Sequence, residues 1–311
     1  MIRRQTAAKG VVAVVIEHGR IDIARVGKAS DAMPVLEICA SVQGEGSDVE
    51  MLSRLRREHD LARIPCVTLM ADGEYQLRAM EAPSVPDEEL KDAVRWRLKD
   101  VLDYPPDAAT VDVISVPAAP NAPAHGNSVY AVAASNELIH ARMAAFAEAK
   151  LSLKVIDIPE MAQRNMATLF ETAGKALAML SVTEDRGLLT FTADGELYLA
   201  RTIDVGLSQL RHAEGELRTQ MLDRLVLEVQ RSLDHFDRQF SQLPVSKLVV
   251  APLPERFGLQ AYLSENMYVQ VEEVRLQDCM DISRVPELAS SAKQGEYFMV
   301  IGAALRHETS G

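Results

Sequence analysis

Hydrophobic and polar positions in the first part of the chain predict three successive strands followed by a helix and a further strand. An apolar run, a tight turn at Glu17, His18, Gly19 and Arg20 and a second apolar run read as a hairpin. Ser47 and Glu50 then form a capping box, which starts a helix running to about His59. The predicted ranges are 11–26 for the hairpin, 33–42 for the third strand, 47–59 for the helix and 64–70 for a buried strand.

The same order of elements returns in the last part of the chain. Three strands separated by short turns are followed by a long helix whose apolar residues recur every three or four positions, and then by a buried strand. The predicted ranges are 176–185, 187–193 and 196–205 for the strands, 222–240 for the apolar helix face and 246–252 for the last strand. Two halves with one element order predict an α/β fold built by duplication.

A third region between the two halves has its own pattern of helix, strand, strand, helix and strand. These elements are predicted at 86–102, 110–116, 128–135, 136–150 and 151–158. A helix at 159–170 then crosses back to the main body. We therefore predict a first half from residues 1–85 plus 157–175, an insertion at 86–156 and a second half at 176–311.

Charge argues against a nucleic-acid-binding protein. The 311 residues contain 33 Lys plus Arg and 45 Asp plus Glu, a net charge of -12, which repels nucleic acid unless basic residues cluster strongly. The most basic stretch, MLSRLRREHDLAR (51–63), has its charges at helix spacing beside leucines and is typical of the solvated face of a packed helix. No nucleic-acid partner is expected.

Cysteine usage and hydropathy favour a cytoplasmic location. Cys39, Cys66 and Cys279 are far apart in the sequence, and the first two lie in apolar strand-like runs, which is typical of core residues in a reducing compartment. No run approaches the roughly 20 apolar residues that span a bilayer. The first ten residues, MIRRQTAAKG, lack the apolar segment of a signal peptide.

Several strings in this frame resemble proteins of the actin-like ATPase fold, and specifically the PilM branch used in type IV pilus assembly. They are ELKDAVRWRLKDVLDYPPDAATVDV (89–113), LYLARTIDVG (197–206), LVLEVQRSLDHFDRQF (225–240) and MVIGAALR (299–306). In that branch an Arg-Trp pair precedes an aromatic-Pro turn at the start of the inserted subdomain. The resemblance implies an actin-like (ribonuclease H-like) duplicated domain with subdomain IA and an IC-like insertion. In length and divergence the chain looks most like members from the mannose-sensitive haemagglutinin pilus system.

The resemblance also implies where a nucleotide would sit, because each half of this fold contributes a turn with an acidic residue, glycine and hydroxyls. Backbone amides of such turns cradle phosphates, and carboxylates position hydrated Mg²⁺. The first turn in PilM-like proteins reads roughly Asp-x-Gly-Ser-x-x-x-Lys, which places Val15 at the Asp, Glu17 at the Gly and Asp22 at the Lys. The acid, the glycine and the cation are all missing.

The other two nucleotide-binding turns of the family are altered as well. The second falls on Ser181, Val182 and Thr183, without its leading Asp, and the third falls on VVAPLPERFG (249–258), where prolines replace glycines. We therefore expect a degenerate nucleotide cleft, no cofactor and no enzymatic activity. The alternative is a nucleotide-switched ATPase with phosphate contacts rebuilt from Gly19, Arg20, Thr183 and Arg186.

Other possible sites are explained better by ordinary structure. QGEGSDVE (43–50) lacks the Lys-Ser/Thr of a phosphate loop and reads as a glycine turn into a capped helix. The seven histidines show no pair at metal-ligand spacing, and His235 is expected to be exposed beside the apolar face of the long helix, so no metal is predicted. The Pro/Ala-rich run 116–127 reads as a surface loop.

A partner-binding surface is the remaining functional prediction. Trp96 is the only tryptophan and is flanked by Arg95 and Arg97, so it either packs in the core of the insertion or holds a partner. The resemblance implies a groove for the cytoplasmic tail of a PilN-type inner-membrane protein. The residues predicted to line it are Arg95, Trp96, Lys99, Leu102 and Tyr104. A secretion ATPase is a possible further partner, and a role in type II secretion is the alternative to a pilus role.

Overall fold

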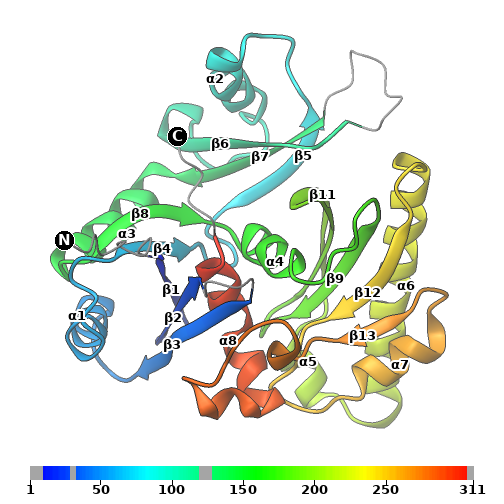
Figure 1. Ribbon diagram of the computed structural model, residues 1–311. Helices are drawn as coiled ribbons and strands as arrows, with labels where there is room; N and C mark the ends of the chain where they lie inside the picture. The colour runs from blue at the N-terminus through cyan, green and yellow to red at the C-terminus, as the bar shows by residue number, and fades with distance from the viewer. Residues whose placement is uncertain (1–9, 29–32, 119–127, 307–311) are drawn as a thin grey trace, which may run out of the picture.

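The computed structural model describes residues 10–28, 33–118 and 128–306 and contains two five-stranded sheets and one three-stranded sheet (Figure 1). The two larger sheets lie side by side, and the small sheet lies at one end of the molecule beside both. The predicted duplicated α/β organisation is confirmed.

The first sheet has the order β3-β2-β1-β4-β8. Strands β1, β2 and β3 form an antiparallel meander, which is followed by helix α1. Strand β4 runs parallel to β1, and β8 runs parallel to β4. Ser47 and Glu50 form the predicted capping box at the start of α1. The elements are β1 (Val12–Glu17), β2 (Arg20–Lys28), β3 (Pro34–Gln43), α1 (Asp48–Glu58), β4 (Pro65–Leu69) and β8 (Ser152–Asp157).

The second sheet repeats this plan in the order β11-β10-β9-β12-β13. Its strands are β9 (Ala176–Val182), β10 (Gly187–Ala193), β11 (Glu196–Ile203), β12 (Val245–Val250) and β13 (Val271–Glu273). Its helices are α5 (Leu207–His212), α6 (Gly215–Gln239) and α7 (Leu259–Asn266). The predicted apolar face of α6 packs on the sheet, where Phe236 stacks on Phe191 with ring centroids 4.7 Å apart.

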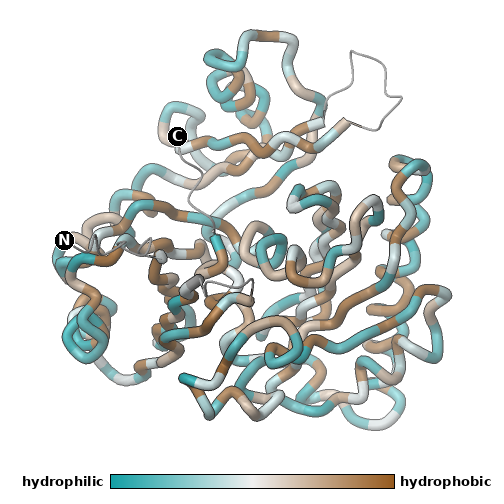
Figure 2. Tube along the Cα trace, in the orientation of Figure 1, coloured by the Kyte–Doolittle hydropathy of each residue, from teal (hydrophilic) through white to brown (hydrophobic). Residues whose placement is uncertain are grey.

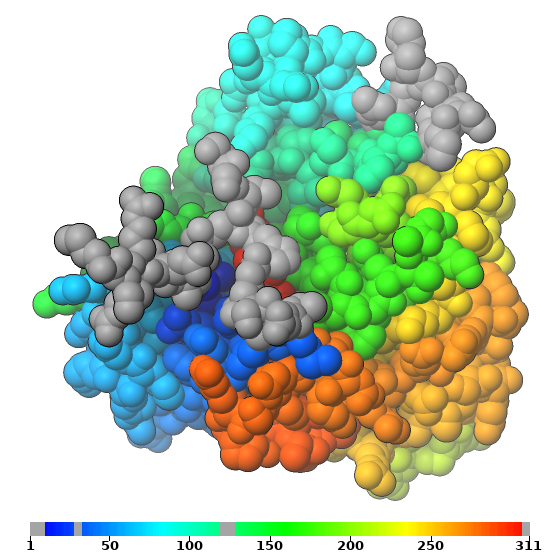
Figure 3. Space-filling model, in the orientation of Figure 1, coloured from blue at the N-terminus to red at the C-terminus, as the bar shows by residue number. Residues whose placement is uncertain are grey.

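Two helices each pack on the sheet of the other half. Helix α4 (Pro159–Ala167) packs against β9, β10 and β11, whereas α8 (Ser291–Ala304) packs against β1, β2 and β4. The two helices also pack closely on each other, and the Asn165 amide donates to the carbonyl of Gly302 at 3.1 Å. In the space-filling view the orange and red segments near the C-terminus lie against the blue first half (Figure 3). This exchange joins the two halves through one buried core.

The small sheet differs from the predicted insertion at both ends. Its order is β5-β7-β6. Strand β5 pairs with β7 from Gln76 to Glu81, so the sheet includes residues that precede the predicted start of the insertion at residue 86. Helix α3 and strand β8 were assigned to the insertion, but both belong to the first half. Strand β8 pairs with β4, and Phe146 of α3 packs in the hydrophobic core against the first sheet. The elements are β5 (Gln76–Glu81), α2 (Asp87–Arg97), β6 (Ala109–Ser115), β7 (Ser128–Ser135) and α3 (Asn136–Glu148).

Hydrophobic residues concentrate on the central strands and polar residues on the outer helices (Figure 2). Cys39 and Cys66 are buried, as predicted, and Cys279 is half-buried. Most of the predicted loop at 116–127 lies outside the described residues. None of the described helices is long and apolar enough to cross a membrane. Short 3-10 helices complete the fold at Pro106–Ala108, Leu276–Asp278 and Pro286–Ala289.

Candidate functional site

The cleft between the two halves brings together the turns that the sequence pattern aligns with a nucleotide site. It encloses a cavity of about 290 Å³ lined by residues of both halves. Glu17, Arg20 and Thr183 line it, and so do Pro252 and Pro254 of the third turn. The structure thus brings Glu17, Arg20 and Thr183 of the predicted cleft together, and its chemistry follows from what these residues contact.

The first turn is a tight hairpin turn of two residues. Glu17 pairs with Arg20, so only His18 and Gly19 connect the strands. Both have positive φ, at 50° and 71°, which is the geometry of a type I′ turn. Gly19 serves this conformation and does not line the cavity.

Arg20 is the cation of the cleft, and its guanidinium is already held by two carboxylates. Its Nε lies 2.7 Å from Asp22 Oδ1 and a terminal nitrogen lies 3.1 Å from Glu296 Oε2, while the group stacks 5.3 Å from the Tyr297 ring centroid. Desolvation in the packed cleft raises the pKa of Asp22 to about 6 and also raises the pKa of Glu17. A phosphate would have to displace these carboxylates and enter a site that already disfavours negative charge.

The second turn satisfies its own polar groups. The N–H and hydroxyl of Thr183 both donate to the carbonyl of Arg186, at 2.9 and 3.1 Å. Its carbonyl accepts from the N–H of Leu207 at 2.9 Å, which presses the start of α5 onto the turn. The Arg186 guanidinium leaves the cleft and pairs with Asp72 on the far side. Arg186 was predicted at the cleft, but it does not line this cavity and lines a second cavity instead.

The third turn is pressed onto helix α8. A Cβ added to Gly295 would lie 2.6 Å from the carbonyl oxygen of Pro252, so the proline-containing loop and the helix are in direct backbone contact. Among the described residues, no group of three His, Cys, Asp or Glu side chains is placed to hold a metal ion.

The predicted partner-binding residues lie on the small sheet's helix and in the turn after it. Trp96 is 58% exposed, which decides against core packing in favour of an accessible surface. Lys99 is exposed, and the half-buried Arg95 pairs with Asp92 at 2.7 Å. Leu102 and Tyr104 are half-buried against the core of the small sheet. The surface formed by Trp96, Lys99 and their neighbours remains a predicted binding site.

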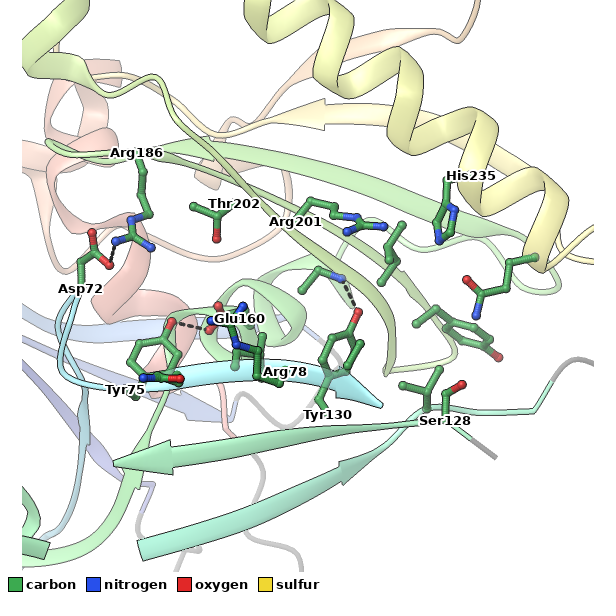
Figure 4. A pocket seen from close by; sticks show the side chains of 18 residues that line it. Asp72, Tyr75, Arg78, Ser128, Tyr130, Glu160, Arg186, Arg201, Thr202 and His235 are labelled. Carbon is green, nitrogen blue, oxygen red and sulfur yellow. Dashed lines mark hydrogen bonds and ion pairs between the residues drawn. The ribbon is translucent and has the colours of Figure 1, made fainter. Parts of the chain in front are cut away.

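A second cavity, of about 590 Å³, lies between the small sheet and the second half (Figure 4). Edge strand β5 forms one wall, edge strand β11 forms the other, and Glu160 of α4 lies at the back. The Tyr75 hydroxyl donates to Glu160 at 2.7 Å, and burial raises the pKa of this carboxyl. His235, predicted to be exposed, is half-buried and lines this groove.

Sequence analysis missed this groove because its residues are far apart in the chain and follow no motif. In QLRAME (76–81) the alternation of polar and apolar residues is short and breaks at Met80, so β5 was not predicted. The string LYLARTIDVG did predict β11, but not that its edge is open.

The sequence matches no protein-family model, and a search of curated proteins finds no significant relative. The fold, by contrast, matches solved structures over nearly its whole length. A chain of the PilM-PilN type IV pilus biogenesis complex superposes with a TM-score of 0.73 at 18% identity, covering 96% of this chain and 98% of that chain.

Two other solved structures agree with this match. The cytoplasmic domain of EpsL, an inner membrane component of the type II secretion system of Vibrio cholerae, gives a TM-score of 0.55 at 14% identity over 96% of this chain and 95% of that one. A Bacteroides thetaiotaomicron protein with an actin-like ATPase fold gives 0.51 at 10% identity over 93% and 99%. The protein therefore has an actin-like fold, as the sequence resemblance implied.

Proposed function

We propose that this protein is a non-enzymatic scaffold that works in the cytoplasm, at the inner membrane, in the assembly of a type IV pilus. It binds the cytoplasmic tail of an inner-membrane partner of the PilN type. The observation that carries this proposal is the match of the whole chain to a chain of the PilM-PilN complex, together with a nucleotide cleft whose turns are occupied by the protein's own side chains.

The cleft supports a scaffold more than a nucleotide-switched ATPase. Phosphate binding in such folds depends on free backbone amides and a free cation. Here Arg20 is shared by Asp22 and Glu296, and Thr183 is bonded within its own turn. Rebuilding a phosphate site from these residues would break each of these contacts.

The surface around Trp96 supports tail binding. A tryptophan that is 58% exposed and flanked by Arg95 and Arg97 has the composition of an interface anchor. An extended tail could place apolar side chains against Trp96, Leu102 and Tyr104 while basic residues meet its polar groups. We assign the tail to this surface.

The particular system is a further part of the proposal. Length and divergence favour the mannose-sensitive haemagglutinin pilus, in which the corresponding protein is MshI. A type II secretion role is the competing assignment, favoured by the similarity to the EpsL cytoplasmic domain. The genes adjacent to the coding sequence distinguish them, because pilin genes would accompany the first system and pseudopilin genes the second.

The direct test is a calorimetric titration of the purified protein with a synthetic peptide of the cytoplasmic tail of the PilN-like protein from the same genome. Saturable binding supports the proposal. Absence of tail binding, combined with a saturable rise in melting temperature with Mg-ATP, would favour the nucleotide-switched ATPase instead.

A further inference from the structure

The groove between β5 and β11 is flanked by two strand edges that belong to different sheets. In the described structure β5 is the outer strand of the small sheet and β11 the outer strand of the second five-stranded sheet. The groove separates the two edges and has a volume of about 590 Å³. An edge strand presents unpaired backbone groups on one side and is a template for adding another strand.

Contacts within the structure show which backbone groups of β11 face the groove. The N–H of Ala200 donates to the hydroxyl of Tyr130, which reaches across from β7, at 2.9 Å. The ladder between β10 and β11 is regular from Leu199 to Ile203. Because an antiparallel ladder alternates, the N–H of Thr202 points the same way as that of Ala200, toward the groove. Tyr130 therefore covers the Ala200 amide of this edge, and the next amide that points toward the groove is that of Thr202.

The charges around the groove are unequal. Arg78 on β5 and Arg201 on β11 both line it, and within the described part of the chain neither guanidinium has a carboxylate within 4.0 Å. Of the acidic groups of the groove, Asp72 pairs with Arg186, and Glu160 is buried at the back, where it accepts from the Tyr75 hydroxyl. His235 lies at the same end, where desolvation and then the charge of Arg201 lower its pKa. The exposed part of the groove, where Arg78 and Arg201 lie, is thus cationic in a protein of net charge -12.

We propose that this groove binds an extended acidic segment of a partner protein, which adds as a strand to the edge of β11 at Thr202, beyond the amide that Tyr130 covers, and places carboxylates against Arg78 and Arg201. Main-chain pairing supplies binding that is independent of sequence, and the two guanidinium groups select for acidic side chains. The groove is separate from the surface around Trp96 on and after α2, here called the α2 surface, which is assigned to the inner-membrane tail. The groove therefore provides for a second partner.

The sequence of the chain's own segment 117–127 does not have the chemistry of this occupant. Residues 117–127, which connect β6 to β7, read PAAPNAPAHGN and contain no acidic residue. Three prolines in this segment also remove N–H groups that strand pairing would use. A partner with carboxylates at alternate positions matches the groove better, because alternate side chains of a strand point to one face.

The test uses fluorescence anisotropy with the full chain and labelled peptides of about ten residues, long enough for an edge strand. One peptide has Glu at alternate positions with Thr and Val between. The control peptide has Lys in place of each Glu. We expect the Glu peptide to bind at least about tenfold more tightly than the Lys peptide, and its binding to weaken with salt. Failure of the Glu peptide to bind would overturn the proposal.

Two variants test the two components separately. Arg78→Glu with Arg201→Glu removes the charge selection, and Thr202→Pro removes an outward N–H without disturbing the ladder to β10. Each should weaken the Glu peptide at least about tenfold while the melting temperature stays near that of the parent. The matched control, Arg95→Glu with Lys99→Glu, makes the same charge change on the α2 surface and should leave Glu-peptide binding unchanged.

The control also separates this site from the proposed tail site. If the tail peptide loses affinity in the Arg95 and Lys99 variant and the Glu peptide does not, both assignments stand. Full Glu-peptide affinity in both groove variants would overturn the groove while leaving tail binding intact. A tail peptide that fails to bind, beside a Glu peptide that binds through Thr202, would overturn only the proposed function.

Discussion

The imidazole Nε2 of His18 lies 3.6 Å from the carboxylate Oδ2 of Asp185. His18 is in the turn between β1 and β2, and Asp185 is in the turn between β9 and β10, so the two halves touch through the turns that sequence alignment assigns to phosphate binding. Here the side chains of the turns meet each other.

We predict that Mg-ATP at millimolar concentration leaves the melting temperature unchanged. A ligand that binds only the folded state raises the free energy of unfolding by RT ln(1 + L/Kd), where L is the ligand concentration, so the absence of a shift means that the Kd lies above the nucleotide concentration used. The measurement is a thermal-shift titration, with Mg²⁺ and inorganic phosphate alone as controls. A saturable rise would show that the contacts of Arg20 and Thr183 open to admit a nucleotide.

Asp22→Asn should change how stability depends on pH. The folded pKa of Asp22 is raised to about 6 from 3.8, so the folded state holds this proton more tightly than the unfolded chain does. Ionisation therefore costs the folded state, and the stability contributed by this group is present below pH 4 and lost as the pH rises toward 6. At about 1.4 kcal/mol for each pH unit, the loss is up to about 3 kcal/mol.

Urea denaturation at several pH values measures this effect. The parent should lose more free energy of unfolding than Asp22→Asn between pH 4 and pH 6. Other titrating groups are common to both proteins, so the difference isolates Asp22. Asp204→Asn, at an aspartate whose side chain is 85% exposed, is the matched control and should follow the parent. Parallel curves for parent and Asp22→Asn would contradict the prediction.

Trp96→Ala should weaken binding of the PilN-type tail at least about tenfold, as expected for an aromatic anchor. Because the side chain is 58% exposed, the free energy of unfolding should change by no more than about 0.5 kcal/mol. Tyr268→Ala is a suitable control, since Tyr268 is 63% exposed on the second half. Calorimetry and urea denaturation measure the two effects, and equal tail affinity for both variants would remove Trp96 from the binding surface.

Gly302→Ala should destabilise the fold by about 1 to 3 kcal/mol, the usual cost of overpacking. A Cβ at this position would lie 2.4 Å from the carbonyl oxygen of Ala162, so α8 and α4 would have to separate. Gly44→Ala is the control, because a Cβ there meets no atom within 4 Å. Chemical denaturation of both variants measures the difference, and equal stability would mean that the helix crossing adjusts freely.

Local sequence patterns were sufficient for most of the strands and helices. The capping box at Ser47 places the start of α1, and the repeated apolar spacing of α6 predicts the face that packs on Phe191. These features depend on residues within one or two turns of each other, so they are visible without knowledge of the rest of the chain.

Pairing between distant segments escaped the sequence. Strand β5 exists because β7 offers it an edge, and β8 joins the first sheet because β4 lies beside it. Neither relationship has a local pattern, which is why the predicted insertion limits of 86 and 156 differ from the observed sheets. The exposure of Trp96 was likewise undecided, because a helix face is buried or open according to what packs on it.

The sequence by itself determined the duplicated α/β plan, the resemblance to PilM-like proteins and the departure of its turns from the PilM-like phosphate-binding pattern, since each is a matter of residue identity and spacing along the chain. Only the tertiary structure decided which contacts the residues near these turns make. The ion pairs of Arg20 with Glu296 and of Arg186 with Asp72 join residues more than 100 positions apart. Such contacts arise when the halves pack together, because burial of their shared core fixes which charges face one another.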